Sequence, residues 1–162
     1  MSRKKAREMV LCLVFEKEYH KDSACEKLYY DLIELAENAE NNEDLQGFEK
    51  NLTAGDKEYI KETFFGVFEN LEQIDDLISG SIIGWKYNRI SKISMALLRI
   101  AVYEIMNSNA SEDVTPSVAI NEAVTLSKIY DDSKAYGFVN GVLGSVAKNI
   151  QGSMTLSKQS GE

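Results

Sequence analysis

Apolar residues recur every three or four positions along most of the chain, which is the spacing of one face of an α-helix. The first stripe consists of Ala6, Met9, Val10, Leu13 and Val14. It predicts a helix from about Arg3 to Tyr19. Ser23 and Glu26 have the spacing of a capping box, so a second helix is expected to begin there. The stripe of this second helix consists of Leu28, Leu32, Leu35 and Ala39.

The longest stripe follows Thr53 and Asp56 and predicts one continuous helix that reaches Ile82. Its members are Ile60, Phe64, Val67, Leu71, Ile74, Ile78 and Ile82. The polar stretch at 40–51, which is rich in Asn and Glu, predicts a loop before it. Gly80 and Gly84 weaken the end of this helix, and a turn is expected at 88–91.

The second half of the chain predicts three further helices. Between Ile93 and Ile105 almost every residue is apolar, so this helix should be surrounded by others. Pro116 suits the first position of a helix that is capped by Thr115 and ends near Tyr130. The stripe of the last helix consists of Ala135, Phe138, Val139, Val142, Leu143, Val146 and Ile150. The expected fold is all-α, a single compact bundle of about seven helices over residues 1–150, with a polar, disordered tail at 151–162.

Charge is distributed unevenly on this acidic chain. The formal net charge is −8, which taken alone disfavours binding to a nucleic acid. Four of the 18 basic residues nevertheless lie within the first seven positions, where there is no acidic residue. These four are Arg3, Lys4, Lys5 and Arg7. A positive surface is therefore expected at one end of the molecule, and RNA is one candidate ligand for it.

Residues with the spacing of a catalytic or metal site are not found. His20, the single histidine, lies at a predicted helix end among charged residues, where a solvated or capping role is expected. Cys12 and Cys25 have no CxxC spacing and are expected to be buried, reduced thiols. No phosphate-binding glycine loop occurs. The sequence thus favours a binding protein without cofactor or metal over an enzyme.

The beginning of the chain combines basic and apolar residues, as a secretory signal does. Glu8 interrupts the junction, three charged residues follow Phe15, and no cleavage site of small residues is seen. No other apolar run approaches the length of a membrane span. A cytoplasmic protein that does not enter a membrane is expected.

Four separated segments carry a family pattern. They are RKKARE at 3–8, LLRIAVYEI at 97–105, INEAV at 120–124 and FVNGVL at 138–143. In this order and spacing they resemble the NusB family of transcription antitermination factors. Weaker agreement at Asp56, Tyr59, 65–67 and Asn70 extends the resemblance to about residues 3–147.

The resemblance implies two packed helical subdomains and a role in binding RNA. It implies that the protein binds the boxA element of single-stranded RNA together with a ribosomal protein, called NusE in this role. The complex would join the transcription elongation complex and support processive transcription of ribosomal RNA operons. For some members the resemblance also implies a homodimer that hides part of the RNA surface.

The same resemblance indicates where RNA would bind. The basic segment, which we define as Ser2, Arg3, Lys4, Lys5 and Arg7, would hold phosphates, with the two arginines as the better candidates for specific contacts. Discrimination between RNA sequences needs groups that stack on bases or bond to their edges. The family pattern places such groups at the last turn between helices. Here the turn carries Tyr130, Lys134, Tyr136 and Phe138.

Four other residues of the matching segments are polar groups on otherwise apolar helices. They are Arg99, Glu104, Asn121 and Glu122. Because buried polar groups need partners, a network that links helices is expected of them.

Two alternatives to an antitermination factor follow from the same residues. One is a helical module that binds protein and ignores RNA. The other is a NusB-like RNA-binding domain of the kind that precedes ribosomal RNA cytosine methyltransferases.

Overall fold

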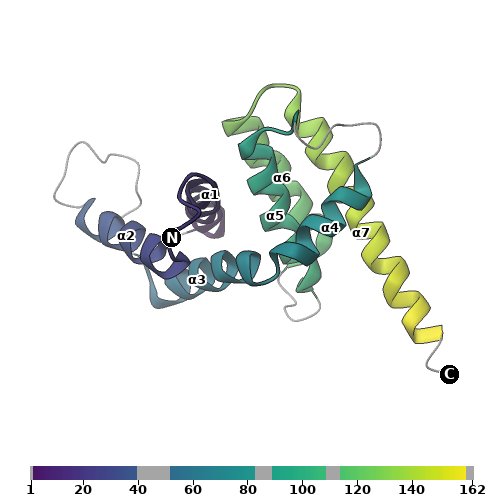
Figure 1. The fold of residues 1–162 in the computed structure, drawn as a ribbon, viewed down its shortest axis with the longest axis horizontal. Helices are drawn as coiled ribbons and strands as arrows, with labels where there is room; N and C mark the ends of the chain where they lie inside the picture. The colour runs from purple at the N-terminus through teal and green to yellow at the C-terminus, as the bar shows by residue number, and fades with distance from the viewer. Residues whose placement is uncertain (1, 40–51, 83–88, 109–113, 160–162) are drawn as a thin grey trace. The chain divides into compact units, whose positions relative to one another are not determined.

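A computed structural model describes residues 2–39, 52–82, 89–108 and 114–159; for residues 154–159 it describes the backbone alone. The described residues form seven α-helices and no strand. They divide into an amino-terminal unit, Met1–Glu69, and a carboxyl-terminal unit, Asn70–Glu162 (Figure 1). The predictions of an all-α fold and of two helical subdomains are confirmed. The predicted loop at 40–51 lies outside the described residues. Of the turn expected at 88–91, residue 88 also lies outside them, whereas 89–91 are described and precede the helix that begins at Lys92.

The amino-terminal unit consists of α1 (Arg3–Tyr19), α2 (Cys25–Asn38) and α3 (Ala54–Glu69), each of which contacts the other two. The stripe predicted for α1 is buried, and the bounds of α1 are those predicted. Thr53 and Asp56 hold the start of α3. Asp56 N donates to Thr53 Oγ1 at 3.1 Å, and Thr53 N donates to an Asp56 carboxylate oxygen at 2.9 Å.

The capping box predicted for α2 is wrong. The residue before the helix is Ala24, which has no side-chain cap. The carbonyl of Ser23 instead accepts a hydrogen bond from Lys17 Nζ at 2.6 Å, which closes the turn between α1 and α2. The predicted stripe also fails at Leu35, which is 42% exposed, because the buried face runs through Ile33 and Ala36 instead.

The single long helix expected between Thr53 and Ile82 is broken at Asn70. Two helices, α3 and α4 (Leu71–Ser81), take its place, and Asn70 lies between them with φ −113° and ψ 19°. Asparagine is a weak helix former because its side chain competes for backbone hydrogen bonds. The apolar spacing continues through the break, so periodicity alone could not reveal it.

The carboxyl-terminal unit is built around α5 (Lys92–Met106), which contacts α4, α6 (Pro116–Tyr130) and α7 (Ala135–Gln159). This confirms the expected central helix. Its core includes Ile74, Ile78, Leu98, Val102, Val139, Leu143 and Val146. Thr115 Oγ1 accepts from Val118 N at 3.3 Å, which confirms the cap before Pro116.

The last helix extends beyond its predicted end. Fraying was expected after Gln151, but α7 continues to Gln159 (Figure 1). No proline ends the helix there, and Ser153 Oγ donates to the carbonyl of Asn149 at 3.0 Å. Among the described helices, none combines the length and apolar character that crossing a membrane requires.

Candidate RNA-binding surfaces

The basic segment lies on the first turns of α1. Ser2 is the N-cap, and its Oγ accepts from Lys5 N at 3.2 Å, so the helix begins at Arg3. No acidic residue lies in the first turn of α1. The exposed amino-terminal end of a helix favours anions, and the cations of this segment add to that preference.

The four cations of the basic segment differ in solvent exposure and in the contacts that they already make. Arg3 and Lys4 are exposed. The Arg3 guanidinium lies over the Tyr59 ring, 4.0 Å from its centroid. Lys5 is half-buried and forms an ion pair with Glu8 at 3.2 Å. Arg7 is only 5% exposed, which leaves little guanidinium surface for RNA, contrary to the role expected of it.

The turn between α6 and α7 is tied to the start of α5 by one carboxylate. Asp131 Oδ2 accepts hydrogen bonds from Ser91 Oγ at 2.7 Å and from Ser94 Oγ at 2.5 Å. Asp131 Oδ1 accepts from the amide of Asp132 at 2.8 Å. Partial burial alone would raise the pKa of Asp131, but these donors outweigh burial and hold the pKa below its ordinary value. We call this arrangement the Asp131 clamp.

Aromatic and basic side chains surround the clamped turn. Tyr130 and Tyr136 are 47% and 42% exposed, and Lys134 is also exposed. Phe138 packs against the core of its unit and is half-buried, so it offers less ring surface than the tyrosines. Lys128, which the sequence did not single out, places Nζ 4.9 Å from the centroid of the Tyr136 ring. Lys128 and Tyr136 are eight residues apart in the sequence, a separation that no helical pattern brings into contact. The turn between α6 and α7 brings the two side chains together.

The two candidate surfaces belong to different units. The basic segment lies in the amino-terminal unit, and the surface from Lys128 to Phe138 lies in the carboxyl-terminal unit. The structure describes each surface within its own unit. The basic segment offers cations, and the turn offers cations together with exposed tyrosine rings; both kinds of group suit single-stranded RNA.

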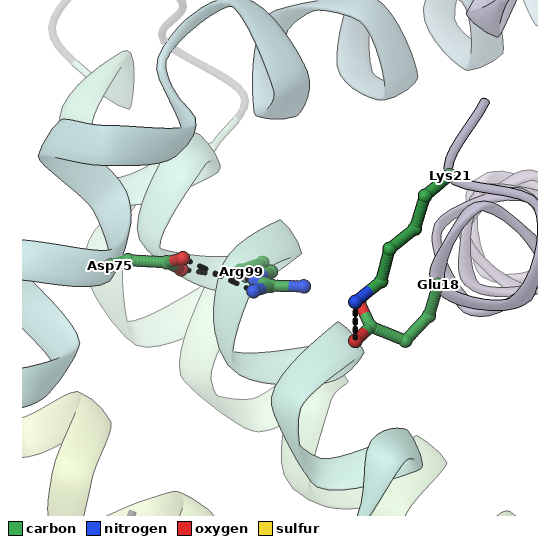
Figure 2. A network of polar contacts seen from close by, with 4 residues as sticks. All are labelled: Glu18, Lys21, Asp75 and Arg99. Atoms are coloured by element: carbon green, nitrogen blue, oxygen red, sulfur yellow. Dashed lines mark hydrogen bonds and ion pairs between the residues drawn. The ribbon is translucent and has the colours of Figure 1, made fainter.

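Part of the expected polar network is present. Arg99 on α5 makes a bidentate pair with Asp75 on α4, with N–O distances of 3.0 and 3.1 Å (Figure 2). Figure 2 also shows the ion pair of Lys21 and Glu18, which lies within the amino-terminal unit at 3.8 Å. Glu104 is buried and Glu122 is half-buried, whereas Asn121 is exposed, contrary to expectation.

The two cysteines and the histidine belong to the amino-terminal unit and are not part of the basic segment. Cys12 is exposed and Cys25 is half-buried, so the prediction of buried thiols is wrong, although both thiols are free. Partial burial raises the pKa of each thiol, and Glu8 and Glu16 add to the effect at Cys12. His20 is the exposed C-cap of α1, as expected. Within the described ranges, no group of three or more potential ligands could hold a metal ion.

Fold and surfaces together define a two-unit, all-helical protein with a basic helix start and a tyrosine-rich turn. The model of the NusB family matches residues 4–148. The transcription antitermination protein NusB of Clostridium perfringens is 39% identical over 93% of this chain and 100% of its own length. The NusB of Acetivibrio thermocellus is 38% identical over 91% of this chain and 90% of its own.

Solved structures agree with the sequence relatives. A structure of T. maritima NusB covers 91% of this chain and 92% of its own, with a TM-score of 0.74 and 28% identity. A complex of the antitermination factors NusB and NusE with double-stranded RNA contains a chain similar to this one, with a TM-score of 0.70 and 26% identity. That match covers 91% of this chain and 96% of the other. The chain belongs to the NusB family.

Proposed function

We propose that this protein is a transcription antitermination factor that binds boxA RNA together with NusE and supports processive transcription of ribosomal RNA operons. The observation that carries the proposal is the family match over residues 4–148. The solved complex of NusB and NusE with RNA supports the choice of partners. In this role the protein acts in the cytoplasm on the transcription elongation complex, by binding rather than by catalysis.

The proposed contacts are those of the basic segment and of the turn. Ser2, Arg3, Lys4 and Lys5 hold phosphates at the start of α1, and Arg7 supports them from a buried position. Three cations that neutralise phosphates of a single strand, Arg3, Lys4 and Lys5, give a slope of about −2 for the logarithm of the association constant against that of salt concentration.

Base discrimination is assigned to the turn. Tyr130 and Tyr136 present exposed rings on which unpaired bases can stack. Lys134 and Lys128 add positive charge beside these rings, and Phe138 contributes from its half-buried position. The acidic remainder of the chain suits a basic partner of the ribosomal type. Removing the four cations of the basic segment from the net charge of −8 leaves −12 on the rest.

Binding to labelled boxA RNA, with and without purified NusE, tests the proposal. We expect boxA to bind more tightly than a scrambled RNA of equal length, and NusE to increase the difference. Equal affinity for both RNAs, in the presence as in the absence of NusE, would overturn it and favour a helical module that binds protein alone. Light scattering with and without boxA would show whether a homodimer competes with RNA.

A further inference from the structure

One cation of the basic segment is held by an aromatic ring. The Arg3 guanidinium lies 4.0 Å from the centroid of Tyr59, a residue of α3, and α1 and α3 are in contact. Arg3 is exposed, whereas Tyr59 is half-buried. Because Arg3 is exposed, its side chain can be reached from solvent while the guanidinium lies over the ring. We call this pair the Arg3–Tyr59 stack.

The backbone beneath Arg3 is also fixed. Ser2 caps α1 through the amide of Lys5, so Arg3 begins a regular helix rather than a loose tail. Among the described residues, no carboxylate forms an ion pair with Arg3. A long side chain that is ordered before binding loses less conformational entropy when its ligand arrives. The Tyr59 ring thus holds the guanidinium in place without neutralising its charge.

Arginine and lysine differ in what they offer RNA. A guanidinium is planar, can stack on a base with one face, and can donate several hydrogen bonds in its plane, whereas an ammonium group acts as a point charge. The neighbouring Lys4 can supply charge but no stacking face. The Arg3 guanidinium can therefore stack on a base as well as donate hydrogen bonds to a phosphate.

We propose that the Arg3–Tyr59 stack is a preformed subsite for one unpaired RNA base. The base stacks on the face of the Arg3 guanidinium opposite the Tyr59 ring, and the N–H groups of Arg3 donate to a neighbouring phosphate. Tyr59 is a positioning residue that acts through Arg3. The inference rests on the proposed function, and it assigns a share of base binding to the amino-terminal unit.

Single abasic substitutions along a boxA RNA test the subsite. The wild-type protein should lose about tenfold in affinity at one position, since stacking on a side chain contributes on the order of 1–3 kcal/mol per base. Arg3→Lys keeps the charge and removes the stacking face. It should bind intact RNA about five- to tenfold more weakly and should no longer respond to that abasic position.

The variants of Tyr59 separate positioning from folding. Tyr59→Phe keeps the ring and should bind like wild type, whereas Tyr59→Leu should lose about two- to fivefold, the size of an exposed cation–π contact. Tyr30→Leu is the matched control. Tyr30 is exposed in the same unit, and the centroid of its ring lies 5.7 Å from Lys61 Nζ. Its replacement should leave both RNA affinity and the abasic profile unchanged.

An Arg3→Lys or a folded Tyr59→Leu variant that keeps the wild-type affinity and abasic profile would overturn the subsite. In that case the proposed function would stand, because the wild-type protein would still prefer boxA. A wild-type protein that binds boxA no better than scrambled RNA would overturn both.

Discussion

Substitution of Asp131 tests whether the Asp131 clamp positions the turn for RNA binding. The loss of a negative charge and the loss of the clamp's hydrogen bonds should change RNA affinity in opposite directions. Asp131→Asn removes a negative charge beside a surface proposed to bind a polyanion. A unit charge about 8 Å from a phosphate in water contributes about 0.5 kcal/mol before screening, so charge alone predicts RNA binding up to about twofold tighter. If the clamp positions the turn, however, binding should weaken.

The size of the positional effect follows from the hydrogen bonds of the clamp. Asp131 accepts from Ser91 and Ser94, and a hydrogen bond to a charged group contributes about 1.5–3 kcal/mol. Asparagine keeps one acceptor oxygen and no charge, so the lower end, about 1.5 kcal/mol, is the reasonable figure. If the loosened turn must be ordered when RNA binds, affinity should fall about tenfold.

Fluorescence anisotropy with boxA RNA measures the effect on variants shown to be folded by circular dichroism. Asp132→Asn is the matched control, because it makes the same change of charge one residue away and keeps a carbonyl that can accept from the amide of Lys134. It should bind slightly more tightly than wild type. Ser94→Ala removes one donor without any change of charge and should weaken binding. If Asp131→Asn binds as tightly as Asp132→Asn, the clamp does not position the turn.

The dependence of the free energy of unfolding on pH provides a second test of the Asp131 clamp. The pKa of Asp131 is lowered in the folded protein, so its contribution to stability is complete above its unfolded pKa of about 3.9 and is lost as the pH falls through the lower folded value. In urea unfolding, the stability difference between wild type and Asp131→Asn should be constant from pH 7 to 5. It should shrink below about pH 3.9, and a difference that grows in acid would contradict the assignment.

Three further predictions concern a salt bridge, a helix cap and a surface charge. Asp75→Asn should lower the free energy of unfolding by about 2 kcal/mol, because it breaks a bidentate pair with a largely buried arginine, and the exposed Asp76→Asn should change it little in the same urea titration. Thr115→Ala should lower the free energy of unfolding by about 1 kcal/mol through loss of the cap of α6, and an unchanged midpoint would argue against that cap. Lys134→Asp should weaken boxA binding at low salt and less so at high salt; unchanged binding at low salt would show that Lys134 does not contribute.

Much of the fold could be predicted because its helices have strong local signals. Pro116 after Thr115 marked the start of α6, and the nearly continuous apolar run from Ile93 to Ile105 marked α5 as central. The break at Asn70 could not be predicted, since the apolar spacing continues across it and only the backbone angles change. The capping box at Ser23 was wrong because the backbone N–H of Ser23, which the Glu26 side chain would bond in such a box, donates to the carbonyl of His20 instead.

The candidate surfaces were predictable in location but not in detail. The cluster of cations before Glu8 and the tyrosines around the last turn are visible in the sequence. The sequence does not show which arginine is accessible. Arg3 and Arg7 lie one turn apart on the same helix and differ only in what packs around them. The pairing of Lys128 with Tyr136 and of Arg3 with Tyr59 depends on tertiary contacts, which leave no local pattern.

The central claim is that the basic segment and the turn bind the same RNA. Titration of the ¹⁵N-labelled protein with boxA RNA, followed through backbone amide chemical shifts, tests it without any substitution. The account predicts shifts at residues 2–7 and at 128–138 with one common dissociation constant, and smaller shifts with scrambled RNA. Shifts confined to one of these segments, or the same shifts with both RNAs, would contradict it.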